Sequence, residues 1–321
     1  MITRRKSLLG LAGVALSGNL FAQQWPTKPI RIIVPYPPGG ANDVSARVYG
    51  PYLSQSLGQT VVIDNRAGAG GQIGAATVAG SAPDGYTLLF GAIGSLTIQA
   101  VVPALKPPYD LMAAFTGVSM GTGVQLAVAV RADLPATTIN SLVSAAKVSS
   151  RGLTYGSAGN GSTQHMTGEY FQQAAGIKLV HVPYKGSSPA IVDLLGGQID
   201  MVFETLPALA SQLSSGKIRI LAVTGDTRSE LLPTTPTLKE SGYPDFGVTT
   251  YYGLLAPQGT PLAVVDRLSK AMQGIAQLPE VQSTLKKQGA EAYATSVDAT
   301  NALIKSEVER WARVQKVAQV K

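Results

Sequence analysis

IRIIVPYPPGGAND, residues 30–43, is the stretch of this chain that decides its fold. The run Ile30–Val34 is short and rich in β-branched residues, which predicts a buried strand. The prolines and glycines that follow end the strand, and Asn42 or Asp43 is placed to cap a helix that begins at Val44. A strand, a tight loop and a helix start aim backbone N–H groups at one small space, an arrangement that attracts an anion.

The same order of strand, loop and helix recurs along the chain. Further strands are predicted at residues 60–64, 86–90, 124–131, 153–156, 179–182, 199–203, 218–223 and 251–256. Helices are predicted at 72–82, 139–148 and 162–175. Another helix is predicted to follow Ser188 as its cap, with Pro189 at the first helical position, and three more begin near Pro261, Pro279 and Val297. This alternation predicts an α/β fold with parallel sheets covered by helices on both faces. Ligands of such folds bind beyond the carboxyl ends of the strands, so a cleft between two α/β domains is expected.

Four strand-to-helix loops stand out, at residues 35–43, 65–74, 91–99 and 156–165. The last of them, GSAGNGSTQH, carries Ser157, Asn160, Ser162 and Thr163 among three glycines. Hydroxyls, an amide and backbone N–H groups at a helix start suit a carboxylate or a phosphate. The same residues also suit an ordinary glycine-rich turn with Ser162 as the helix cap, and the sequence leaves both interpretations open.

Composition narrows the classes of function. The chain has 321 residues, 45% hydrophobic and 14% charged, which fits two domains or one large one. Its net charge is +7, but no basic run is interleaved with aromatic residues, so we expect no nucleic-acid partner. There is no cysteine, and the two histidines are His165 and His181, so we expect no metal site.

The sequence suggests two enzymatic alternatives. Gly68, Gly70 and Gly71 follow a strand and suggest a dinucleotide loop, but Ile73 stands where the last glycine is needed, so we expect no cofactor. Ser162 and His165 lie three residues apart and suggest a secreted hydrolase. No carboxylate is obviously placed to orient His165, and we therefore assign no catalytic residue.

The first 22 residues have the pattern of a secretion signal. Arg4, Arg5 and Lys6 precede the apolar, small-residue stretch from Leu8 to Ala22. That stretch is too short for a comfortable membrane span, and Ala22 ends a signal-peptidase-like site. We therefore expect export to the periplasm.

Several motifs in order resemble the extracytoplasmic solute-binding proteins of the tripartite tricarboxylate transporter group, the Bug family. They are WPTKPIRIIVPYPPGGANDVSARV, NRAGAGGQIGA, PDGYTLL, YGSAGNGSTQH, HVPYKGSSPAIVDLLGGQID, GKIRILAVTGDTRSELLPTTPTLKESGYP and YYGLLAPQGTP, from Trp25 almost to the C-terminus. The resemblance implies a two-domain periplasmic-binding-protein fold of type II, with two doubly wound sheets and a ligand cleft between them. It implies domains at 23–124 plus 252–321 and at 125–251.

The resemblance also implies a monomeric receptor that binds a small organic acid and delivers it to membrane permease subunits. A sensor that presents its closed form to a histidine kinase is the alternative. The facing loops would be Tyr36–Asp43 and Ser157–His165, while Glu204 stands where the family commonly has Asp or another polar residue. The expected ligand-binding residues are Tyr36, Pro37, Gly39, Gly40, Asp43, Ser95, Ser157, Asn160, Gly161, Ser162, Thr163, His165, Tyr184 and Glu204.

Cleavage after Ala22 is directly testable. Intact-mass analysis of a periplasmic extract should give a chain that begins at Gln23, because the basic cluster and apolar stretch direct export. A cytoplasmic protein that retains Met1 would contradict this prediction.

Overall fold

The computed structural model describes residues 25–318, so the predicted signal segment lies outside the described residues. The strands are β1 (Ile30–Val34), β2 (Val61–Asn65), β3 (Thr87–Ala92), β4 (Phe115–Arg131), β5 (Leu153–Ser157), β6 (Leu179–Pro183), β7 (Met201–Thr205), β8 (Ile218–Val223), β9 (Thr249–Pro257) and β10 (Ala290–Ala292). The helices are α1 (Ala41–Leu57), α2 (Gln72–Ala79), α3 (Ile93–Val101), α4 (Leu111–Ala114), α5 (Ile139–Val148), α6 (Thr163–Ala175), α7 (Ser187–Leu195), α8 (Leu206–Leu209), α9 (Leu262–Ala276), α10 (Pro279–Lys286) and α11 (Val297–Ala318). The predicted α/β class is confirmed.

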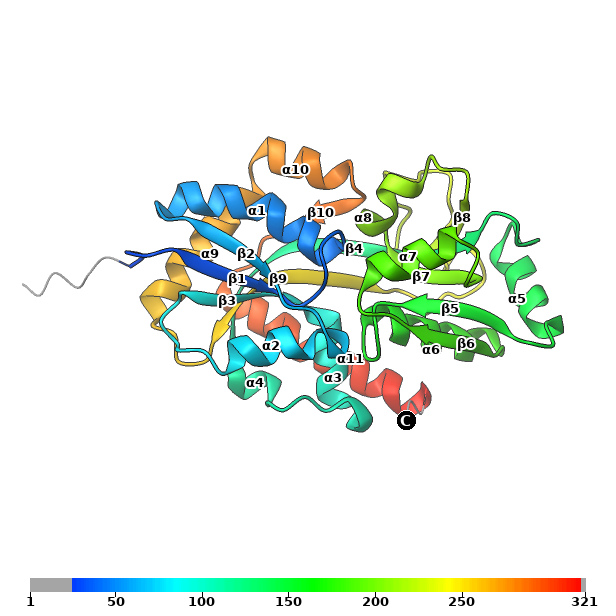
Figure 1. Ribbon diagram of the computed structural model, residues 1–321, viewed down its shortest axis with the longest axis horizontal. Helices are drawn as coiled ribbons and strands as arrows, with labels where there is room; N and C mark the ends of the chain where they lie inside the picture. The colour runs from blue at the N-terminus through cyan, green and yellow to red at the C-terminus, as the bar shows by residue number, and fades with distance from the viewer. Residues whose placement is uncertain (1–24, 319–321) are drawn as a thin grey trace, which may run out of the picture.

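Two sheets share strand β4. The first follows the order β2-β1-β3-β9-β4, with β10 also on β4, and the second follows β4-β7-β5-β6, with β8 also on β4. We call the part built on the first sheet the first lobe and the part built on the second sheet the second lobe. Figure 1 shows them side by side along the long axis of the molecule, with β4 and β9 between them.

The sheets contain the predicted parallel strands and also antiparallel ones, which the alternation of elements did not predict. Strands β1, β2 and β3 run parallel, as do β5, β6 and β7, which fits the predicted βαβ units. In contrast, β9 is antiparallel to β3 and β4, and β4 is antiparallel to β7 and β8. The chain leaves the first lobe along β4 and returns along β9, so these two strands must run in opposite directions.

Strand β4 is much longer than the sequence suggested. Its first part pairs with β9 from Phe115 to Gln125, and its last part pairs with β7 from Leu126 onward. The sequence predicted only residues 124–131. The missed part, FTGVSMGTG, contains three glycines, which have low strand propensity and hide the strand from pattern analysis.

Each lobe has an apolar core of its own. In the first lobe, Ile32 and Phe90 of the sheet pack with Tyr49 of α1 and Leu268 of α9. In the second lobe, Leu126, Tyr155 and Phe203 pack with Phe171 and Phe246. Burial of one such side chain contributes about 1.5–3 kcal/mol, so both cores hold their sheet edges rigidly in place.

The C-terminal helix α11 belongs to both lobes. Ile304 packs with Phe115 of the first lobe, whereas Trp311, further along the helix, is 1% exposed within the core of the second lobe. The Trp311 indole N–H donates to Glu307 at 3.1 Å, which satisfies its one polar atom. Figure 1 shows α11 running beneath both lobes.

Two predicted helix caps and one predicted loop are wrong. Helix α1 begins at Ala41 with Gly40 as its N-cap, and α7 begins at Ser187 with Gly186 as its N-cap. Gly186 has φ 129°, a conformation that favours glycine, so the chain turns into α7 before Ser188. The predicted loop at 91–99 is mostly helix α3, because β3 passes into it without a connecting segment.

Asp200 ties the strands of the second lobe together. Its carboxylate accepts from Arg131 at 3.1 Å, from Arg151 at 2.7 Å and from the Thr154 amide at 2.9 Å. Burial alone would raise the pKa of Asp200, but these hydrogen bonds outweigh burial and hold it below its usual range. The resulting stability is present above the pKa of Asp200 in the unfolded chain and is lost as the pH falls through its folded pKa.

We expect Asp200→Asn to lower the free energy of unfolding by about 2 kcal/mol near neutral pH, because charged hydrogen bonds are lost. Urea denaturation should show the deficit shrinking as the pH falls through the folded pKa, where wild-type Asp200 also becomes protonated. Asp133→Asn is the control, since Asp133 is 75% exposed and also pairs with Arg131. An equal effect of both variants would contradict the role of Asp200.

Candidate functional site

A small buried cavity lies between the lobes. It is lined by Tyr36, Gly40, Ala41, Asn42, Ala92, Ser95, Ala158, Thr163, Gln164, Ser187 and Tyr252. About 20 Å³ is open to the centres of water-sized molecules, which suffices for about one water. The lobes are therefore closed around it, and a larger guest needs them to separate.

Four helices begin at this cavity. Gly40 and Ala41 start α1, Ala92 precedes α3, Thr163 starts α6 and Ser187 starts α7. In Figure 1, α1 and α7 begin near the middle of the molecule and run away from it into different lobes. Each helix N-terminus carries a partial positive charge, so the cavity favours negative charge without any lysine or arginine among its described lining residues.

Asn42 has unused hydrogen-bonding capacity inside the cavity. It is 3% exposed, and neither its amide nitrogen nor its amide oxygen has a partner in the described structure. Leaving such buried groups unsatisfied costs about 1–3 kcal/mol. An amide that offers both a donor and an acceptor to a buried space indicates a place for a polar guest.

Glu204 is a buried acidic group behind Gln164 and Ser187 of the cavity wall. It is 1% exposed, and its Oε1 accepts from Gln164 Nε2 at 3.0 Å, from the Thr205 amide at 2.7 Å and from the Thr205 hydroxyl at 2.9 Å. Burial raises its pKa above the usual range, although these hydrogen bonds work in the opposite direction.

Two tyrosines frame the cavity. The Tyr36 hydroxyl donates to the Gly70 carbonyl at 2.9 Å, and burial raises the pKa of Tyr36 to about 12. Burial also raises the pKa of Tyr252, and the neighbouring charge of Glu204 adds to the shift in both residues. Both rings therefore stay neutral at physiological pH and serve as hydrogen-bonding walls.

Tyr36 and Ala158 also line a second, larger pocket of about 360 Å³ between the lobes, which we call the mouth. Asn160 and Tyr184 line this mouth, together with Lys106 from the first lobe and Lys185 from the second. No acidic residue is among its described lining residues, so the mouth is cationic whereas the cavity has no cationic side chain on its described walls.

The loop from Ser157 to His165 supports the cavity more than it lines it. The Ser162 hydroxyl caps α6 by accepting from the His165 amide at 3.2 Å, as one of the two open interpretations predicted. Ser157 Oγ lies 2.7 Å from His181 Nε2, and the His165 and His181 rings stack with centroids 4.0 Å apart. Burial lowers the pKa of both histidines, that of His181 to about 3.

His165 is not arranged as a base for Ser162. Its Nδ1 accepts from the Gly161 amide at 3.2 Å, and its Nε2 lies 3.9 Å from Glu169. The hydrogen bond between His165 and Ser162 joins the His165 backbone N–H to the Ser162 hydroxyl. The geometry thus gives the hydrolase alternative no support.

Three predicted residues of the first loop, Pro37, Gly39 and Asp43, are not among the cavity lining. Asp43 accepts from Arg47 at 2.9 Å, from the Gly39 amide at 3.0 Å and from Asn65 at 2.9 Å. It therefore holds the loop in shape instead of meeting a guest. Pro37 packs closely against Gly186 of the second lobe.

Of the predicted ligand-binding residues, Tyr36, Gly40, Ser95 and Thr163 line the cavity, and Asn160 and Tyr184 line the mouth. The sequence-based set does not include Gln164, Ser187 or Tyr252, and it treats Asn42 only as a helix cap. Asn42 and Gln164 lie within two of the predicted loops. Their position in those loops, at the start of a helix, was the one sequence signal that could have identified them as cavity residues. Tyr252 follows no loop motif and carried none.

The comparisons with known proteins agree with this architecture. Residues 45–319 match the model of the tripartite tricarboxylate transporter family receptor. The chain belongs to this family. The receptor is 37% identical over 317 residues to protein BugT of Bordetella pertussis, which covers 98% of this chain and 97% of BugT.

Two solved structures resemble the receptor closely. One is R. palustris Rpa4515 with adipate, with a TM-score of 0.89, 34% identity, and coverage of 92% of this chain and 98% of that one. The other is MatC from Rhodopseudomonas palustris with bound malate, with a TM-score of 0.86, 28% identity, and coverage of 90% and 99%. These similarities confirm the periplasmic-binding-protein fold that the sequence motifs implied.

The described residues contain neither a membrane-spanning helix nor a metal cluster. Among residues 25–318, no helix has the length and apolar character to cross a membrane. Within the same residues, no group of three or more histidines and acidic residues is arranged to hold a metal ion.

Asn42→Leu should leave the free energy of unfolding unchanged or raise it, because it replaces an unpartnered buried amide by an apolar side chain of similar size. Asn65→Leu is the matched comparison, since the Asn65 amide donates to the Tyr36 carbonyl and to Asp43. We expect the Asn65 variant to lose about 2 kcal/mol in urea denaturation. An equal loss in the Asn42 variant would show that its amide is satisfied.

Proposed function

We propose that this receptor binds a small carboxylate between its lobes, in the periplasm, and delivers it to the permease subunits of a tripartite tricarboxylate transporter. The observation that carries the proposal is the convergence of four helix starts on a cavity that holds the unpartnered amide of Asn42. Backbone N–H groups and an amide donor together bind a carboxylate without a formal cation.

Two further facts support the choice of ligand class. The related structures carry adipate and malate, which are both dicarboxylates, in chains that align over nine-tenths of this one. The mouth presents Lys106 and Lys185 from opposite lobes, which favours the approach of an anion.

Closure would convert binding into a signal. We propose the sequence-based domains, 23–124 plus 252–321 and 125–251, as the bodies that move. Contacts across the closed cavity include Ser188 Oγ to the Pro38 carbonyl at 2.9 Å and the Thr163 amide to Ser95 Oγ at 3.4 Å. The ligand must bind the closed form more tightly than the open form for a permease to distinguish them.

A thermal-shift screen with adipate, malate, succinate, aspartate and benzoate tests the ligand class. A ligand that binds only the folded state raises the melting temperature in proportion to the logarithm of its concentration. We expect at least one acid of this panel to do so. If none does, a carboxylate receptor is the wrong assignment.

Thr163→Val tests the site itself. Thr163 lines the cavity at the start of α6, and loss of one hydrogen bond to a charged group costs about 1.5–3 kcal/mol, a ten- to hundredfold loss in affinity. Calorimetry with the tightest acid of the panel measures the change. Thr77→Val is the control, because the Thr77 hydroxyl donates within α2 to the Ile73 carbonyl, and this variant should bind the acid as the wild type does.

A further inference from the structure

The buried carboxyl of Glu204 presents an electrostatic conflict for a carboxylate receptor. It lies at the closed end of the site, with Gln164 and Ser187 between it and the cavity. No lysine, arginine or histidine is among the described residues that hydrogen-bond it or line the cavity. The partial charges of the four helix starts must therefore compensate either Glu204, or the ligand, or both.

An ionised Glu204 and a ligand carboxylate in the adjacent cavity would place two full negative charges side by side in a buried space, which the helix starts there do not fully compensate. At full strength the four helix starts would together supply about two elementary charges, but the effect of each is confined to its first turn. Of these four starts, Glu204 contacts those of α6 and α7, through Gln164 and Ser187, and these two residues also line the cavity, so the two anionic groups compete for the same partial charges. When two anionic groups share a buried site, the pKa of one of them rises until it takes up a proton. Tyr36 and Tyr252, which frame the same space, are neutral and add no positive charge.

The elements packed against β7 offer Glu204 no other charge partner in the described structure. On α6, the His165 ring stacks on His181, and Glu169 accepts from Tyr155. On α7, Asp193 accepts from Tyr184. On β4, the residue opposite Glu204 is Ala127, which has no charge. Tyr155 of β5 donates to Glu169, and α8 has no ionisable side chain. Glu204 is thus the acid–base group whose charge a bound anion would sense, through Gln164 and Ser187.

We infer that the ligand carboxylate in the cavity and Glu204 share one negative charge, so that this receptor binds its ligand together with a proton. The inference rests on the proposed function. On this basis, Glu204 loses its charge on closure and remains as a hydrogen-bonding carboxylic acid. Its Oε1 already accepts three hydrogen bonds, and the Ser187 hydroxyl donates to the same carboxyl. The Oε2 oxygen is therefore the natural place for the proton, from which it donates to Ser187 in the cavity wall.

The inference predicts a pH dependence of defined sign. Above the pKa of Glu204 in the ligand-free protein, each binding event must take a proton from solvent. The affinity for the acid then falls by up to about tenfold for each unit of pH. A neutral amide of the same shape brings no charge, so its affinity should be flat over this range.

Calorimetry at several pH values from acid to alkaline, in two buffers of different ionisation enthalpy, measures the proton uptake directly. The probe is the tightest-binding acid among adipate, malate, succinate, aspartate and benzoate, and the comparison is the analogue in which every carboxyl is an amide. We expect the wild type to take up close to one proton for each acid bound at the higher pH values, and none for each amide.

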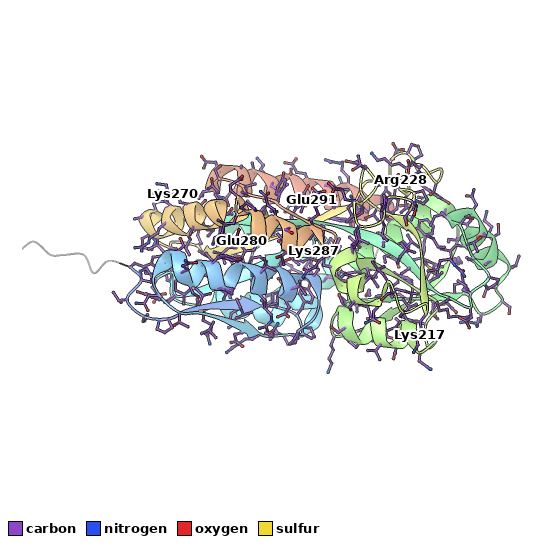
Figure 2. The ribbon with its side chains drawn as sticks, turned by 90° about the horizontal axis from the view of Figure 1, so that it is seen from above. Lys217, Arg228, Lys270, Glu280, Lys287 and Glu291 are labelled. Carbon is purple, nitrogen blue, oxygen red and sulfur yellow. The ribbon has the colours of Figure 1, made fainter. Side chains whose placement is uncertain are left out.

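Glu204→Gln should abolish both the uptake and the loss of affinity at high pH, so that in alkaline buffer it binds the acid at least about tenfold tighter than the wild type. Glu280→Gln is the matched control, because Glu280 is exposed on α10 in the first lobe (Figure 2), and it should behave as the wild type. If Glu204→Gln does not fold, the acid and amide titrations of the wild type still show whether acid binding takes up a proton.

Acid binding without proton uptake at any pH overturns the inference and leaves the receptor function standing. Uptake that persists in Glu204→Gln also overturns it, because another group must then take the proton. If no acid of the panel binds, the proposed function fails and the inference fails with it.

Discussion

The continuity of β4 is the constraint on which the rest of the molecule depends. One uninterrupted strand supplies backbone hydrogen bonds to the first sheet through β9 and to the second sheet through β7 and β8. Because the two lobes are joined within a strand, their relative placement is set by local twist in β4 and β9. Helix α11 adds a third link, since it packs on Phe115 of one lobe and inserts Trp311 into the core of the other. The two lobes are therefore connected through β4, β9 and α11.

Charge at the site is organised by backbone more than by side chains. Four helix starts meet where the lobes touch, and the cationic side chains of Lys106 and Lys185 lie at the mouth. A buried lysine or arginine would hold an anion more strongly, but it would also need a counter-charge when the site is empty. Helix starts need no such counter-charge, because each carries only a partial charge. Glu204 is the exception that gives the interior an acid–base group of its own.

The sequence predicted the alternation of elements well, because periodicity and turn residues are local signals. Each strand predicted outside β4 is present, with its ends shifted by two residues at most. The errors lie where long-range contacts override local preference. Glycines hid the first part of β4, which β9 stabilises by pairing, and Gly40 and Gly186 took the capping positions expected of Asn42, Asp43 and Ser188. The missed part of the site was likewise non-local, since Ser187 and Tyr252 reach the cavity only because separate strands meet there.

The strand order determines when the first sheet can form during synthesis of the chain. β9 lies between β3 and β4, so the N-terminal strands of the first sheet cannot be joined to β4 until residues 249–257 have been added. Until then the edge of β3 has no partner on that side, and the apolar faces of β1 and β3 lack the covering helix α9. The first lobe is thus a late product of synthesis despite its early start in the sequence. Early collapse of the N-terminal part of the chain is therefore thermodynamically unrewarding, because the contacts that stabilise it are far away in the sequence.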